Sequence, residues 1–259
     1  MATVREIADF LEELAPSSLK MDFDNVGLLV GLENRPVERV LVALDITEDV
    51  IDEAENVDAE LIVSHHPLFF AGLKSVTDGD ATGEKIVRLL TGGISAVCMH
   101  TNLDAAPGGV NDALAAALGL SVRGILNRAE GISRICALPE AMDFESFLSR
   151  VCAALSANGL RYHDAGRPVS VVGICGGAGG DDLTLAAESG CDTYVTADLK
   201  YHQFLLAKEL GLNLIDAGHF CTENVIVPVL HDRLTEKFPE LLVIISRRHV
   251  QTDRFYIPD

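Results

Sequence analysis

Residues 40–67 read VLVALDITEDVIDEAENVDAELIVSHHP and contain a strand, a helix and a second strand in succession. The run VLVALD at 40–45 lacks polar alternation, which is typical of a strand buried on both faces. Thr47 can cap a helix over 48–54, and LIV at 61–63 is the next strand. Strand–helix–strand alternation with short connections predicts α/β units on a largely parallel or mixed sheet.

The same alternation extends in both directions from this stretch. Apolar spacing predicts a first helix over 4–14, and Pro16 ends it. The other predicted elements are strands at 26–31 and 94–98 around a helix at 83–90, then strands at 169–175, 193–195 and 212–215 with helices ending at 189 and spanning 202–210. The stretch 241–257 is strand-like and is expected to return to pair with one lobe.

We therefore expect an α/β fold of two similarly built lobes with mixed sheets. The first lobe covers 1–124 and is joined by the C-terminal return 225–259, and the second covers 125–224. When the halves are laid side by side, Val195-Thr196 falls where Val63-Ser64 falls. This order of elements favours a diverged internal duplication, and two ordinary α/β units are the alternative.

The composition excludes several classes of protein. Of 259 residues, 48% are hydrophobic and 23% are charged, which is not a disordered composition. No apolar run reaches the roughly 18 residues that span a bilayer, and the N-terminus lacks a signal-peptide pattern, so a cytoplasmic protein is expected. The net charge of −19 disfavours nucleic-acid binding, although small anionic substrates remain possible near a metal cation.

The six cysteines occur singly, without a CxxC pair. In a chain of this length they are expected to be reduced thiols and not a disulfide framework or a thiolate zinc site. Cys221 remains open as a weak metal neighbour because it lies within a candidate metal-binding motif.

A histidine followed four residues later by a carboxylate occurs twice, as His100/Asp104 and as His219/Glu223. The second copy falls where the first falls in the order of elements. A histidine pair, His65-His66, ends the strand at 61–63 just before a proline. All these side chains come after strands, and active sites of α/β sheets lie at the carboxyl ends of strands. Imidazole and carboxylate are ligands that suit divalent metals.

Each of these residues also has a structural interpretation. Asp104 could serve a turn or a helix cap, and Glu223 could be a first-turn carboxylate favoured by the helix dipole. Their joint occurrence at strand ends favours a metal site. Five nitrogen and oxygen donors exceed a tetrahedral site and suit two metals about 3.5–4 Å apart, bridged by Asp104 or Glu223. His100 then orients a ligand or transfers protons.

Five motifs carry a resemblance to a known family: DNVGLLVG at 24–31, SHHP at 64–67, HTNLD at 100–104, DLKYH at 198–202 and DAGH at 216–219 with Glu223. Together they resemble the GTP cyclohydrolase 1 type 2 homolog family, the NIF-three-like dinuclear metal-centre proteins. The resemblance runs nearly end to end. The chain lacks room between 125 and 168 for the middle domain of longer members, and Phe23 stands where the family often has tryptophan.

The resemblance implies a dinuclear metal site whose ligands match a set of five residues in both halves of the chain. These are His65, His66, Asp104, His219 and Glu223. It also implies a toroidal homohexamer whose sites face an internal cavity. Two divalent ions per subunit are expected, and zinc, iron, manganese, cobalt and nickel all suit these ligands.

Two further features have open interpretations. The glycine-rich turn at 176–180 could cradle a phosphate on its backbone amides or could simply be a flexible turn. Lys200 and His202 could be substrate-binding or proton-transfer groups, or could merely begin a helix. With His100, they are the candidate catalytic residues.

The functional expectation is a metal-dependent hydrolase that acts on a nucleotide-like or other small anionic molecule, with the dimetal site at the junction of the lobes. A cyclohydrolase reaction is implied by the resemblance alone. The alternative is a non-catalytic metal-binding hexamer with a metal-trafficking, regulatory or protein-interaction role.

Overall fold

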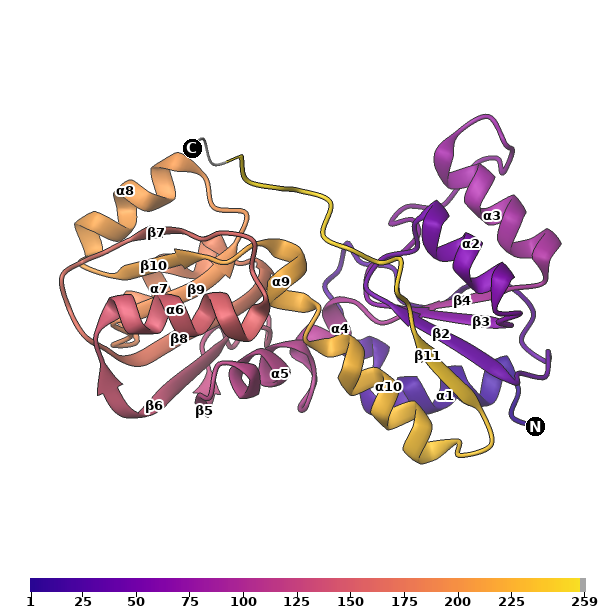
Figure 1. Ribbon diagram of the computed structural model, residues 1–259, viewed down its shortest axis with the longest axis horizontal. Helices are drawn as coiled ribbons and strands as arrows, with labels where there is room; N and C mark the ends of the chain where they lie inside the picture. Colours follow the sequence, from indigo (N-terminus) through magenta and orange to yellow (C-terminus); the bar gives the residue numbers. More distant parts are fainter. Residues whose placement is uncertain (257–259) are drawn as a thin grey trace. The chain divides into compact units, whose positions relative to one another are not determined.

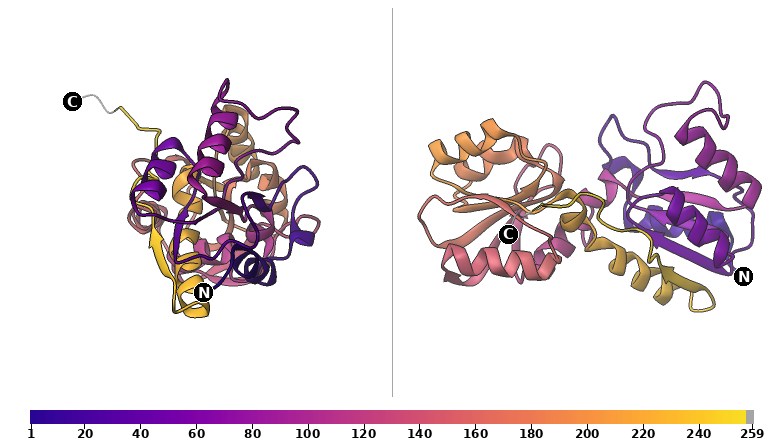
Figure 2. Two further views of the ribbon diagram at one scale, coloured as in Figure 1. Left: turned by 90° about the vertical axis from the view of Figure 1, so that its right-hand side faces the viewer. Right: turned by 45° about the horizontal axis from the view of Figure 1, so that its top comes forward.

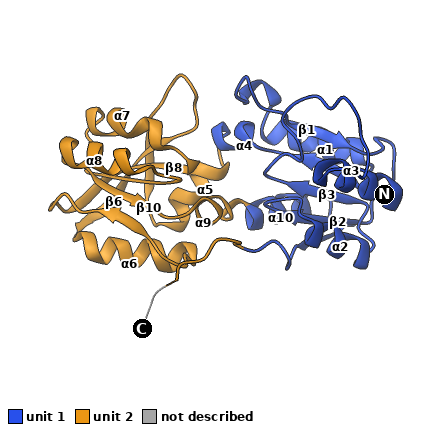
Figure 3. Ribbon diagram, turned by 90° about the horizontal axis from the view of Figure 1, so that it is seen from above, with its two compact units in different colours: residues 1–106, 227–250 blue, residues 107–226, 251–259 orange. Residues whose placement is uncertain are grey.

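The computed structural model describes residues 1–256, which form two compact units (Figures 1 and 3). Unit 1 comprises residues 1–106 and 227–250, and unit 2 comprises residues 107–226 with the C-terminal residues from 251. The chain therefore passes between the units three times. Each unit contains a mixed sheet with helices, so the predicted α/β fold class is confirmed.

Unit 1 contains a five-stranded sheet in the order β1-β4-β3-β2-β11. Its strands are β1 (Gly27–Val30), β2 (Arg39–Ala43), β3 (Leu61–Ser64), β4 (Ser95–Cys98) and β11 (Leu242–Ile245). β11, β2, β3 and β4 are parallel, and β1 pairs antiparallel with β4. β11 provides the strand-like return that the sequence predicts, although the strand itself is confined to residues 242–245.

Helices cover this sheet on both faces (Figure 1). The helical elements of this part of the chain are α1 (Val4–Leu14), the 3₁₀ turn η1 (Ser17–Leu19), α2 (Glu48–Asn56), α3 (Ala81–Gly92), α4 (Thr101–Ala105) and α10 (Ile226–Lys237). Val50 and Ile51 of α2 and Leu89 of α3 pack on Leu41 of the sheet in one buried cluster. The predicted cap of α2 is confirmed, because the Thr47 hydroxyl accepts from the Val50 amide at 3.2 Å.

Unit 2 contains a six-stranded sheet in the order β5-β6-β8-β9-β10-β7. Its strands are β5 (Ser121–Ile125), β6 (Arg134–Met142), β7 (Arg161–His163), β8 (Val169–Ala178), β9 (Thr193–Ala197) and β10 (Asn213–Asp216). β8, β9 and β10 are parallel, and the other three strands pair antiparallel. The sequence pattern assigns no element to residues 107–168, which form β5, β6, β7 and two helices.

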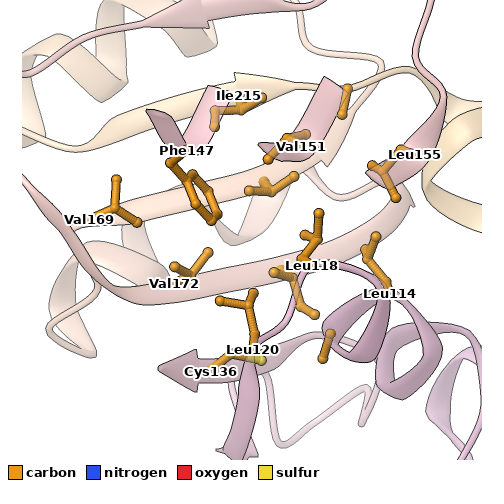
Figure 4. Packing of buried hydrophobic residues seen from close by; sticks show 14 of the residues in the cluster. Leu114, Leu118, Leu120, Cys136, Phe147, Val151, Leu155, Val169, Val172 and Ile215 are labelled. Carbon is orange, nitrogen blue, oxygen red and sulfur yellow. The ribbon is translucent and has the colours of Figure 1, made fainter. Parts of the chain in front are cut away.

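The helices of unit 2 are α5 (Val110–Ala117), α6 (Phe144–Leu155), the 3₁₀ turn η2 (Gly180–Asp182), α7 (Leu183–Glu188), α8 (Tyr201–Leu210) and α9 (His219–Glu223). Phe147 and Val151 of α6 pack with Leu114 of α5 on Val172 of the sheet (Figure 4). A second cluster buries α7 and α8 on the other face, and Figure 2 shows these orange helices opposite the pink helix α6.

The unit boundaries differ from those expected at residues 124/125. The first crossing lies between residues 106 and 107, because Leu114 and Leu118 belong to the core of unit 2. At the other end, residues from 251 join unit 2, where the Asn158 side chain donates to the Asp253 carbonyl at 2.8 Å. Residues 257–259 of the expected return lie outside the described residues.

Among residues 1–256, no helix is both long enough and apolar enough to cross a membrane.

Candidate metal centre

The histidine pair of unit 1 lies directly after β3. The backbone amides of His65 and His66 both donate to the Leu44 carbonyl, at 3.2 and 2.9 Å, which fixes the turn that leaves the strand. The Ser64 hydroxyl donates to the His66 carbonyl at 2.9 Å. His65 is fully buried and His66 is partly buried. The strand end therefore holds both imidazoles in defined positions.

His100 joins this pair from the end of the neighbouring strand β4. The ring centroids lie 5.0 Å apart for His65–His66, 5.3 Å for His65–His100 and 5.6 Å for His66–His100. Each ring offers a nitrogen within 4.8 Å of the others, so the three imidazoles could hold one ion. The sequence predicts only an orienting or proton-transfer role for His100, and its position in the structure equally suits a ligand.

All three imidazoles are oriented through Nδ1. His65 Nδ1 lies 2.7 Å from the Met99 carbonyl, His66 Nδ1 lies 2.7 Å from Asp45 Oδ1, and His100 Nδ1 lies 2.8 Å from Asp24 Oδ1. A carbonyl cannot donate, so His65 carries a proton on Nδ1, and in the neutral ring Nε2 is then the acceptor. Metal-binding histidines are held by partners of this kind. The donor set therefore fits a divalent metal.

Asp104 and Asp24 complete the polar residues around this cluster. Asp104 lies on α4, is 6% exposed, and places Oδ1 3.6 Å from His65 Nε2. Asp24 also accepts from the Thr101 amide at 3.0 Å and from the Thr101 hydroxyl. Burial by itself raises the pKa of Asp24, but the hydrogen bonds from His100 and Thr101 outweigh it and hold the pKa well below its usual range. Asp24 is therefore an anion that fixes His100.

In unit 2, α9 presents the second motif. His219 Nδ1 lies 2.8 Å from Asp198 Oδ2, and its Nε2 lies 3.1 Å from Glu223 Oε2, one helical turn along. Desolvation opposes the imidazolium, yet the hydrogen bonds and charges of Glu223 and Asp198 raise the pKa of His219 to about 9. Glu223 is 3% exposed. His219 Nε2 and the buried Glu223 carboxylate are thus arranged to hold one cation between them, either a proton or a metal ion.

Asp198 occupies a strained backbone position directly after β9. Its φ is +55°, a left-handed conformation that aspartate tolerates better than most residues. The following amide, Leu199 N, donates to Asp216 Oδ2 at 3.1 Å, and Arg161 binds both Asp216 and the Leu199 carbonyl. This network holds the loop so that the Asp198 carboxylate reaches His219.

The glycine-rich segment 176–180, where β8 ends and η2 begins, has backbone amides engaged by side chains of unit 2. Gly176 N donates to Asn111 at 2.8 Å, Gly177 N to the Thr222 hydroxyl at 3.0 Å, and Gly179 N to the Thr196 hydroxyl at 2.8 Å. These three amides are therefore not presented to a phosphate, and the segment forms the end of β8 and the connection to η2 instead of one flexible turn.

Gly177 also has a steric role. Its φ is +63°, and a Cβ there would collide with the Glu223 carboxylate. The glycine is thus required for Glu223 to lie where it does.

The remaining candidates have less defined surroundings. Lys200 and His202 are exposed residues at the start of α8, two and four residues after Asp198, and their catalytic role stays a prediction. The Cys221 thiol donates to Gln251 Oε1 at 3.3 Å, and burial raises its pKa, so Cys221 is a protonated thiol hydrogen-bonded to Gln251.

The sequence patterns assign no role to the carboxylates that orient the histidines. Asp24, Asp45 and Asp198 each lie in a loop and bind a histidine 76, 21 and 21 residues away. Asp45 and Asp198 come shortly after β2 and β9, so the strand-end rule that located the histidines could have located these two as well.

The fold and these residues define a two-unit α/β protein in which both units present imidazole and carboxylate groups suited to a divalent metal. The chain belongs to the Duf34/NIF3 (NGG1p interacting factor 3) family, which matches residues 2–252. The family resemblance carried by the five motifs is confirmed.

Relatives and solved structures of this family cover nearly the whole chain. The GTP cyclohydrolase 1 type 2 homolog of Clostridium perfringens is 35% identical over 240 residues, 90% of this chain and 92% of that protein. The homolog of Clostridium acetobutylicum is 36% identical over 263 residues, covering 97% and 98% of the two chains. The crystal structure of a Bacillus cereus protein related to NIF3 superposes with a TM-score of 0.89 at 26% identity over 99% of both chains.

Proposed function

We propose that this protein binds two divalent metal ions and is a metal-dependent hydrolase that acts on a nucleotide-like small molecule. Unit 1 would contribute His65, His66 and Asp104, and unit 2 would contribute His219 and Glu223, as the five ligands of the two ions. Zinc, iron, manganese, cobalt and nickel all suit this mixture of imidazole and carboxylate.

The orientation of the histidines is the observation that carries the proposal. Four imidazoles drawn from both units have Nδ1 within 2.8 Å of a carboxylate or carbonyl oxygen of their own unit. Such partners fix the ring and raise the basicity of the opposite nitrogen, as they do at known metal sites.

A divalent pair, when bound, supplies Lewis-acid polarisation and a water of lowered pKa. The surrounding side chains would then transfer protons and bind the substrate. His100, fixed by Asp24, moves protons at the substrate or adds a further nitrogen ligand. Lys200 and His202 bind the anionic part of the substrate or transfer protons. The printed name of the Clostridium relatives, GTP cyclohydrolase 1 type 2 homolog, supports GTP as the first substrate to test.

The test combines metal analysis with turnover. The purified protein is expected to contain about two ions per chain and to convert GTP or another phosphorylated small molecule, and H65A and E223A are expected to lose that activity. The matched control is H231A, because His231 also has Nδ1 2.8 Å from an aspartate, Asp232, but lies on α10 outside the candidate set. Unchanged metal content in the combined variant H66A/H219A would refute the site.

The second candidate function is a non-catalytic metal-binding protein with a trafficking, regulatory or interaction role. The family description, NGG1p interacting factor 3, supports an interaction role as this second candidate. Both functions use the same five ligands, so only turnover separates them. Full metal occupancy without conversion of GTP or of a panel of phosphorylated small molecules would favour this candidate.

We further propose that the chain assembles as a toroidal homohexamer whose sites face the internal cavity, as the family resemblance implies. Light scattering on the purified protein should then give a mass six times the 27.8 kDa of one chain. A monomer or dimer at micromolar concentration would refute the assembly without affecting the metal site of a single chain.

A further inference from the structure

Two exposed phenylalanines of unit 1 lie against each other. Phe23, in the loop before β1, is 63% exposed, and Phe70, in the loop after β3, is 52% exposed. Their ring centroids are 6.3 Å apart and the ring planes are inclined by 47°. Single exposed apolar residues are ordinary, but contiguous apolar surface marks binding sites far more often.

This pair is continuous with the imidazole cluster. The Phe70 ring lies 5.7 Å from the His100 ring, at an interplanar angle of 65°, and the His100 ring in turn contacts His65 and His66. A row of rings therefore runs from solvent-exposed Phe23 through Phe70 to the candidate metal-binding nitrogens. A ligand that stacks on the phenylalanines has its other end beside His100.

Hydrogen bonds hold the two loops in this arrangement. The Asn25 side chain donates to the Phe69 carbonyl at 2.9 Å, which ties the loop of Phe23 to the loop of Phe70. The Met21 amide donates to the Thr101 hydroxyl at 2.9 Å, and Lys20 Nζ donates to the Asp24 carbonyl at 2.8 Å. The rings are thus positioned before any ligand binds, which reduces the entropy lost on binding.

We propose that Phe23 and Phe70 form a stacking site for the planar nitrogen heterocycle of a nucleoside-like substrate. The inference rests on the proposed function, since it names the part of the substrate that these side chains recognise. Aromatic side chains stack on every nucleobase because each has a π-face, and two phenyl rings provide contact area for one ring system and not for a broad protein surface. Contact with the row of rings at His100 aligns that heterocycle with the metal-binding residues.

Calorimetric titration of the full chain with guanosine, and separately with ribose 5-phosphate, tests the inference. F23A and F70A should each weaken guanosine binding by at least about fivefold, since a base stacked on an aromatic side chain typically contributes that much or more. Ribose 5-phosphate binding should be unchanged. F23W should bind guanosine at least as tightly as the native chain. L90A is the control, because Leu90 on α3 is also 50% exposed.

Several results would overturn the inference. They are a native chain that does not bind guanosine, alanine variants that bind it as tightly as the native chain, and an equal loss of ribose 5-phosphate binding. A changed assembly mass in F23A or F70A at unchanged guanosine affinity would instead assign the pair to contact with a second copy.

Metal content, measured on the same samples, separates this inference from the proposed function. F23A and F70A should retain the native metal content, and a parallel loss of metal would assign the effect to the imidazole cluster and overturn the stacking site. A native chain without metal that still binds guanosine through these two residues would refute the metal centre and leave the stacking site standing.

Discussion

The two units share a four-stranded arrangement and differ in the side chains placed at the strand ends. The order β1-β4-β3-β2 in unit 1 matches β7-β10-β9-β8 in unit 2, with three parallel strands and one antiparallel neighbour in each. His65-His66 come directly after β3, whereas Ala197 ends β9 and Asp198 comes next. Unit 1 thus uses this strand end for two imidazoles, and unit 2 uses it for the carboxylate that orients His219.

The hydrogen-bond register refines the comparison of the two motifs. Ser64 pairs with Cys98 and Thr196 pairs with Asp216, and the next amide, of Met99 or Ala217, donates back at 2.9 Å in both units. Counting from these pairs, His100 corresponds to Gly218, one residue before His219. The two motifs therefore correspond as elements, as the sequence predicts, but are displaced by one residue.

The largest expected effect comes from removing ligands in one unit at a time. If both units serve one dinuclear centre, H65A/H66A in unit 1 and H219A/E223A in unit 2 should each lose most of the bound metal. The measurement is elemental analysis of protein purified in parallel, with H231A as the control. Retention of the native metal content by the unit 2 variant alone would show that unit 1 binds metal without it.

Removing an orienting carboxylate should have the next largest effect. D45N in unit 1 and D198N in unit 2 each leave a candidate ligand in place but weaken its fixed hydrogen bond to Nδ1. Loss of such partners typically lowers metal affinity about 10–100-fold. Competition with a chromogenic chelator measures the change. D232N provides the control, since it disturbs only the pair with His231 on α10. Equal affinities in all three variants would contradict the orienting role.

G177A should combine a steric effect with a conformational one. The new methyl group meets the Glu223 carboxylate, so metal affinity should fall, and the left-handed φ should cost about 1–2 kcal/mol of folding stability. Gly211 has the same φ of +63° with nothing within 4 Å of a Cβ. G211A should therefore lower stability by a similar amount and leave metal affinity unchanged. Identical metal affinity in the two variants would show that Glu223 does not depend on Gly177.

Helix caps should give the smallest effects and report on each unit separately. Thr47 caps α2 of unit 1, and Asp143 caps α6 of unit 2 by accepting from the Ser146 amide at 2.8 Å. T47A and D143A should each cost about 1 kcal/mol. Hydrogen exchange measured along the chain should show the loss of protection confined to the unit that carries the substitution. A uniform loss in both units would mean that they unfold as one.

Much of this protein could be predicted from local sequence patterns. Runs such as VLVALD and LIVS are apolar without alternation, and that pattern depends only on neighbouring residues, so it indicates the strands and the α/β class. His65, His66, His219 and Glu223 stand immediately after such strands or within the next turn. Their candidacy comes from the rule that strand ends carry functional side chains.

Only the tertiary structure decided which distant groups meet. The pairing of His100 with Asp24 joins residues 76 positions apart, and no local pattern encodes which loops come together. The same holds for Gly177 beneath Glu223 and for Phe70 beside His100. The unit boundary at 106/107 has no local signal either, because the packing of Leu114 and Leu118 on a sheet formed later in the chain determines it. Local periodicity thus fixes the elements, whereas long-range packing selects their partners.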